Sequence, residues 1–165
     1  MMLRRFHSCR KGSAAAEMAL VLPLMVLILF TSLEAGNYFY AQHQVVKGLR
    51  DGARFAARHS FDEINCRSGG YIDSALAANV KTLARTGKLS GGTTRVKGWV
   101  DGDITVTVTC STTTQATTGI YSSSESAPQV NVATSLSYDS LFNGLGVITN
   151  SFTLNAEQQA TVMGI

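Results

Sequence analysis

Residues 10–34 read RKGSAAAEMALVLPLMVLILFTSLE, and this stretch decides how the whole chain is organised. Between Ser13 and Leu33 it runs for 21 residues with one charged side chain, that of Glu17. A helix of this length crosses a hydrocarbon core of about 30 Å. We therefore predict a single membrane-spanning helix over residues 13–34.

The twelve residues before the span form a basic leader without acids. They contain Arg4, Arg5, Arg10 and Lys11, and a Lys and Arg bias beside a span predicts that this end stays in the cytoplasm. The rest of the chain is then expected outside. Removing these four cations from the 14 Lys and Arg leaves 10 against 11 Asp and Glu. The formal charge of +3 is thus a property of the leader, and no basic stripe indicates nucleic-acid binding.

A secretory signal peptide and an uncleaved anchor are two other interpretations of this end. A signal peptide needs small residues spaced as A-x-A after the apolar stretch, and residues 33–35 (LEA) fit poorly. Glu17 argues against both, because a carboxylate in a spanning helix is costly and needs a partner. A cut after Gly12 would place the new amine of Ser13 one helical turn from the Glu17 carboxylate. A neighbouring subunit could instead offer its own amine to this carboxylate. A carboxylate solvated by lipid head groups is the remaining interpretation.

The amino-terminal third of the chain also carries a resemblance. Residues 11–23 (KGSAAAEMALVLP) resemble the amino terminus of the TadE-like family of tight-adherence (Flp) pilus pseudopilins. The similarity continues through residues 34–36 (EAG), the aromatic run 38–40 (YFY) and residues 51–57 (DGARFAA). It covers about residues 10–57 and is weak beyond them.

The resemblance implies properties that composition and spacing do not show. A prepilin peptidase would cut between Gly12 and Ser13, and Glu17 would act in maturation or subunit pairing. The mature chain would be a minor pseudopilin of the bacterial inner membrane, with other pilins and the pilus assembly platform as partners. The pilus would serve surface attachment and biofilm formation. The family's companion TadF-type proteins are similar too, and Ser at position 13 leaves amino-terminal methylation open.

After the span, helical spacing of apolar residues continues through residues 35–60. Apolar side chains recur every three or four positions while charged ones lie on another face. We expect one helix from Ser13 to about Ser60, half in the membrane and half supporting an outer domain. Pro23 has no N–H for the helical hydrogen bond, which predicts a kink there.

Three small residues, Gly48, Gly52 and Ala56, repeat every four positions of this helix. Each glycine costs about 1 kcal/mol against alanine in a helix. A strip of small residues lets another backbone approach closely. We predict packing within the same domain, and a neighbouring subunit's helix is the alternative.

Residues 61–165 are predicted to form an outer, periplasmic domain. Residues 74–84 have the spacing of a short helix, and Gly87 predicts its end. Four stretches alternate apolar and polar residues, and residues 101–103 (DGD) predict a hairpin between the first two. The result is an α+β, pilin-like fold in which the long helix packs on a small antiparallel sheet. The four predicted strands are residues 96–100, 104–110, 130–138 and 152–162.

Two cysteines remain if the leader, with Cys9, is removed. Cys66 and Cys110 form an even pair, which suits an oxidising compartment. A disulfide between them would contribute about 4 kcal/mol in the chain-entropy model. Two unlinked buried thiols are the alternative.

Motifs for catalysis, cofactors or metals are absent from the sequence. Neither outer cysteine has a histidine near it, and His43 and His59 are isolated. No nucleophile elbow or zinc-protease motif occurs. We therefore expect no enzyme, no cofactor and no metal site.

Residues 111–126 (STTTQATTGIYSSSES) are polar and of low complexity. We expect a solvated connection, with an adhesive or glycosylated loop as the alternative. The second interpretation gives the alternative function, a monomeric membrane-anchored binding or adhesion domain of the cell envelope.

Overall fold

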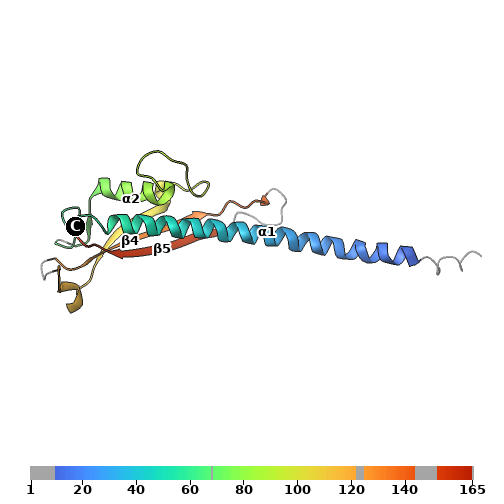
Figure 1. Ribbon diagram of the computed structural model, residues 1–165, viewed down its shortest axis with the longest axis horizontal. Coiled ribbons are helices and arrows are strands. Elements are labelled where there is room, and N and C mark those ends of the chain that lie inside the picture. The colour runs from blue at the N-terminus through green and yellow to red at the C-terminus, as the bar shows by residue number, and fades with distance from the viewer. Residues whose placement is uncertain (1–9, 68, 122–124, 144–151, 165) are drawn as a thin grey trace, which may run out of the picture.

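The computed structural model consists of one long helix, α1 (Arg10–Ala56), and a small domain beside its second half (Figure 1). The first half of α1 extends away from the domain as an isolated rod. The α+β, pilin-like fold class is confirmed. The structure describes residues 10–67, 69–121, 125–143 and 152–164, and the predicted leader residues 1–9, Cys9 included, lie outside them.

α1 is continuous, as the helical spacing predicts, and it ends at Ala56 rather than near Ser60. One face of its second half, with residues three or four positions apart, is buried. This face packs on the sheet and on the second helix, α2 (Ser74–Thr86). The residues of this face are Ala41, Val45, Leu49, Ala53 and Ala56.

Three antiparallel strands form the main sheet in the order β3-β4-β5. They are β3 (Ile104–Cys110), β4 (Pro128–Ser137) and β5 (Thr153–Thr161), close to three of the four predicted strands. The central strand alternates buried and less buried residues, so one face of the sheet meets α1. The shared core also contains Leu76, Val80, Trp99, Ile104, Val130, Val132, Leu136, Leu154 and Val162.

Both ends of α2 are capped. Asp73 accepts hydrogen bonds from the backbone N–H groups of Ala75 and Leu76, at 2.9 and 3.1 Å. Gly87 follows the helix with φ of 75°, and its N–H donates to the carbonyl of Leu83. The predicted end of this helix at Gly87 is therefore confirmed.

The predicted hairpin around residues 101–103 is wrong. Residues 96–100 form no strand, because Gly98 has φ of 79° and Trp99 turns its ring into the core. The indole N–H donates to Thr134 on β4 at 3.0 Å. A single 3₁₀ turn, η2 (Asp101–Asp103), then leads into β3, whose ladder partner is β4.

The structure also contains a two-stranded ribbon that no sequence pattern predicts. β1 (Ile64–Asn65) pairs antiparallel with β2 (Tyr71–Ile72), and both strands have two residues. Alternation cannot be recognised over such short strands. The ribbon links the end of α1 to the start of α2.

Candidate functional site

The rod formed by the first half of α1 is the most distinctive surface of the molecule. Large apolar side chains between Met18 and Leu33 are exposed around the helix. The side chain of Leu20, for example, is 80% exposed. The hydroxyls of Thr31 and Ser32 donate to carbonyls of the preceding helical turn, so they need no external partner. Among the described residues, α1 is the one helix long and apolar enough to cross a membrane. Such a surface is suited to lipid or to other apolar helices.

The predicted cleavage and pairing residues lie at the start of the rod. Gly12 and Ser13 are in the first turns of α1, and Glu17 follows one turn later with an exposed side chain. Pro23 lies inside the same helix, which runs on without interruption. The roles of these four residues stay predictions.

The small-residue strip lies between the two helices of the same chain. A Cβ added at Gly48 would overlap the carbonyl oxygen of Ala84 on α2, and one at Gly52 would lie 3.2 Å from the carbonyl oxygen of Val80. Ala56 is fully buried at the end of α1. The two backbones approach this closely only because side chains are missing at the crossing.

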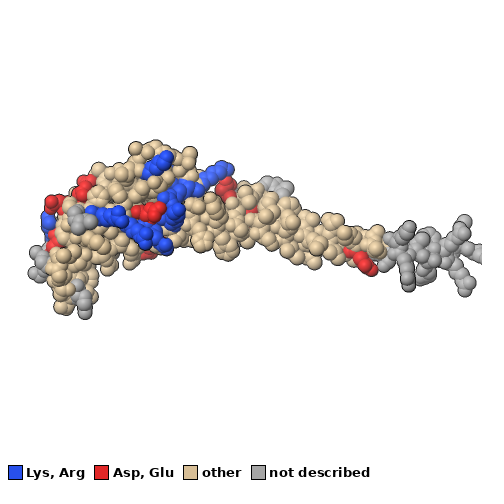
Figure 2. Space-filling model, in the orientation of Figure 1, with Lys and Arg blue, Asp and Glu red and all other residues tan. Residues whose placement is uncertain are grey.

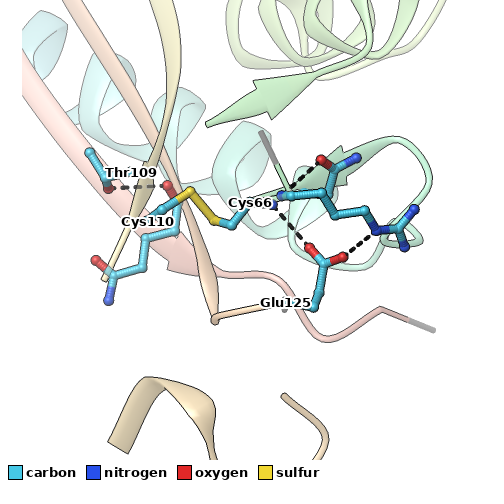
Figure 3. The surroundings of a disulfide bond; sticks show 7 residues. Cys66, Thr109, Cys110 and Glu125 are labelled. Carbon is cyan, nitrogen blue, oxygen red and sulfur yellow. Dashed lines mark hydrogen bonds and ion pairs between the residues drawn. A yellow bond between two sulfur atoms is a disulfide. The ribbon is translucent and has the colours of Figure 1, made fainter. Parts of the chain in front are cut away.

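A disulfide joins Cys66 to Cys110, with the two Cα atoms 5.7 Å apart (Figure 3). It ties the segment after β1 to the end of β3. Glu125 lies beside it and accepts hydrogen bonds from the backbone N–H of Cys66, at 3.0 Å, and from the Arg67 guanidinium. This carboxylate raises the pKa of Arg67, first through the hydrogen bond and then through charge attraction. The pairing of the two cysteines is the one that the sequence predicts.

The polar loop 111–126 is attached to the domain at several described points. The backbone of Ala127 donates to Ala116, and the hydroxyl of Tyr121 donates to the carbonyl of Val162 at 2.6 Å. Glu125 adds the contacts beside the disulfide. Residues 122–124 of the predicted loop lie outside the described residues.

Charged side chains gather over the outer domain and leave the rod largely without charge (Figure 2). Several cations pair with acids: Arg95 lies 2.7 Å from Asp51, and Lys97 lies 2.7 Å from Asp139. The hydrogen bond to Asp139 raises the pKa of Lys97. Solvent screens an exposed pair such as Lys97–Asp139, so it adds little to the stability of the domain. The rod is therefore apolar, and the charged side chains belong mainly to the outer domain.

A buried polar cluster lies where the rod meets the domain. Glu34 is 4% exposed on α1, and its Oε2 accepts from the backbone N–H of Phe142 at 3.3 Å. The Tyr138 hydroxyl lies 3.4 Å from the backbone carbonyl of Glu34, to which it donates, and accepts from Asn37 Nδ2 at 2.7 Å. Burial first, and then the interaction of the phenol with the Glu34 side chain, raise the pKa of Tyr138 to about 12.

Sequence reasoning gave this cluster no role. Glu34 marked the end of the span, and Tyr138 was one residue of a predicted strand. They are 104 positions apart, so only the fold shows that they meet. The available signal was a carboxylate directly after an apolar run, followed by aromatic residues.

Metal chemistry has no support in the described part of the chain. No group of three His, Cys, Asp or Glu side chains there could hold a metal ion. His59 Nδ1 lies 2.8 Å from Glu63 at the surface, and His43 is exposed.

Comparison with known proteins finds a family match in the amino-terminal part of the chain. The family model described as TadE-like protein matches residues 12–54, which is nearly the whole of α1. The resemblance inferred from the sequence is thereby confirmed over this helix. No curated protein and no solved structure matches the chain. The family match suggests a part in a tight-adherence pilus, and one apolar amino-terminal helix fits a single-pass membrane anchor there.

Proposed function

We propose that this TadE-like chain is a minor pseudopilin of a tight-adherence pilus. The first half of α1 anchors it in the bacterial inner membrane, the amino end faces the cytoplasm, and the sheet domain lies in the periplasm. The observation that carries this proposal is the exposed apolar rod inside the matched range of residues 12–54. A soluble domain would have to cover such a surface, whereas a membrane or a bundle of like helices covers it without cost.

Maturation is proposed to begin with a prepilin peptidase that cuts between Gly12 and Ser13. The position is supported by the basic residues Arg10 and Lys11 on its cytoplasmic side. Gly12 lowers the stability of the first helical turn by about 1 kcal/mol relative to alanine. Unwinding this turn for a peptidase therefore requires little free energy.

Assembly is proposed to depend on Glu17. Its carboxylate lies near the start of the rod, and a charge in lipid costs about 3 kcal/mol at the bilayer centre and less toward the interface. The amine created at Ser13 lies one turn away in the same chain, and a neighbouring chain shifted along its axis brings its own amine to this level. The pairing neutralises two charges together and fixes the axial register of the two helices.

The outer domain is proposed to project from the membrane into the pilus or its base. The disulfide between Cys66 and Cys110 supports an oxidising location, because such bonds persist outside the cytoplasm. Once assembled, the pilus serves surface attachment and biofilm formation. The role is one of assembly through helices, without catalysis.

Glu17 substitutions test this proposal. We expect Glu17→Ala to keep the domain folded and oxidised but to lower the amount of pili sheared from cells by at least about tenfold, in line with loss of one charged pair. Glu157→Ala, which removes an exposed carboxylate from β5, is the matched control and should assemble normally.

Normal piliation by Glu17→Ala would contradict the pairing mechanism. Crosslinking in the membrane adds a second readout for the whole proposal. If the wild-type chain is anchored in the membrane but never crosslinks to another helix, the result would favour the monomeric adhesion domain instead.

A further inference from the structure

A pocket of about 330 Å³ lies where the rod meets the domain. This volume is at the lower end of the roughly 300–1,000 Å³ range of small-molecule sites. Its lining is almost wholly apolar and includes the rings of Tyr38, Phe39, Tyr138 and Phe152. Phe39 and Phe152 are 61% and 55% exposed, so they form an open aromatic rim.

Among the described residues that line the pocket, Glu34 contributes the one carboxyl group. Its Oε2 accepts from the backbone of Phe142, whereas its buried Oε1 has no hydrogen-bond partner in the described part of the chain. A buried carboxylate oxygen without a donor is costly, and native structures normally supply one. The terminal torsion of a glutamate is broad, so the carboxyl group can turn toward the pocket. The missing donor is therefore expected from a ligand.

The position of the pocket relative to the membrane indicates which ligands can reach it. The uncharged part of the span ends at Leu33, and the 20 residues from Ala14 to Leu33 rise about 30 Å, the thickness of a hydrocarbon core. Glu34 then lies at the level of the outer head groups. Aromatic side chains such as Tyr38 and Phe39 concentrate at this level in membrane proteins. This step rests on the anchoring proposed above.

We propose that the pocket binds a lipid head group that carries a primary ammonium, with its N–H donating to Glu34 Oε1. The ammonium satisfies the orphan oxygen and neutralises the carboxylate. The aromatic rim attracts the same cation through its ring faces and holds the apolar part of the lipid. Phosphatidylethanolamine has this chemistry. Phosphatidylcholine has the same charge but no N–H donor, and phosphatidylglycerol brings a repelling anion without a cation.

The test uses the purified full chain in mild detergent and native mass spectrometry. Equimolar phosphatidylethanolamine and phosphatidylcholine with identical acyl chains are added, and the retained lipid is counted. The wild type should retain phosphatidylethanolamine about tenfold more than phosphatidylcholine, as expected for one charge-assisted hydrogen bond. Glu34→Gln should reduce this ratio to near one. Glu157→Gln on exposed β5 is the charge-matched control and should keep the preference.

Equal retention of the two lipids by the wild type, or an unchanged preference in Glu34→Gln, would overturn the proposal. A preference for added phosphatidylglycerol would do the same. If Glu34→Gln does not fold, the wild type is tested with mono- and dimethylated ethanolamine lipids, and retention must fall as N–H donors are lost. A lipid-free wild-type dimer that Glu34→Gln abolishes would assign the pocket to a second copy of the chain.

Flotation with vesicles separates this proposal from the anchoring on which it rests. A chain that floats equally with ethanolamine and choline vesicles but shows no lipid preference refutes only the head-group site. A chain that floats with neither refutes the anchor.

Discussion

Replacing Gly48 by alanine tests the helix crossing that holds α1 against the domain. In an open helix this change is stabilising by about 1 kcal/mol, because alanine has the higher helix propensity. At Gly48 the new methyl group would overlap the backbone carbonyl oxygen of Ala84 and lie 3.1 Å from the ring of Trp99. A backbone oxygen cannot rotate away, so the two helices must move apart.

The expected loss follows from these two opposing terms. Overpacking a well-packed core costs about 1–3 kcal/mol, and a clash with backbone belongs at the upper end. Subtracting the gain in helix propensity leaves a net loss of about 2 kcal/mol for Gly48→Ala. For a domain of roughly 100 residues this loss lowers the melting temperature by about 10 °C.

Gly36→Ala is the matched control in the same helix. Nothing lies within 4 Å of a Cβ built at Gly36, so this variant should be as stable as the wild type or slightly more stable. The assay is thermal unfolding of the full chain in mild detergent, followed by circular dichroism. A Gly48→Ala protein as stable as Gly36→Ala would refute the close crossing of α1 and α2.

The other predictions concern the disulfide and the buried tyrosine. Cys66→Ser should destabilise the domain by about 4 kcal/mol in denaturant titration, since the bond closes a separation of 44 residues; equal stability of oxidised and reduced wild type would contradict this. The pKa of Tyr138 is about 12 in the folded protein, against an ordinary value of 10.0. The protonated phenol therefore contributes about 2–3 kcal/mol to the free energy of unfolding below pH 10, and this contribution is lost as the pH rises toward 12. Tyr138→Phe should remove this alkaline loss of stability, and an unchanged pH profile would argue against the buried phenol.

Elements with a long, regular pattern could be predicted from the sequence. The spacing of apolar residues over some 45 positions defines α1, and strict alternation of valine and threonine gives β3 with both ends correct. A terminating glycine with positive φ places the end of α2 at Gly87. In each case local propensity and tertiary packing favour the same structure.

The failures come from contacts between distant segments. Residues 96–100 have the composition of a strand, but Gly98 turns the chain and Trp99 gains more by filling the core and bonding Thr134. Glu34 and Tyr138 meet because the last strands pack on α1. No local sequence pattern predicts this packing. The sequence therefore predicts the assembly residues, whose roles stay predictions, and gives no sign of the pocket where the rod meets the domain.

The most direct test of the central claim is the mass of the amino-terminal peptide of membrane-extracted protein, from cells with and without the prepilin peptidase. With the peptidase the chain should begin at Ser13, which creates the amine that Glu17 requires; without it the basic leader should remain. A chain that begins at Met1 in cells with active peptidase, or one that begins after Ala35, would contradict the proposed maturation and assembly.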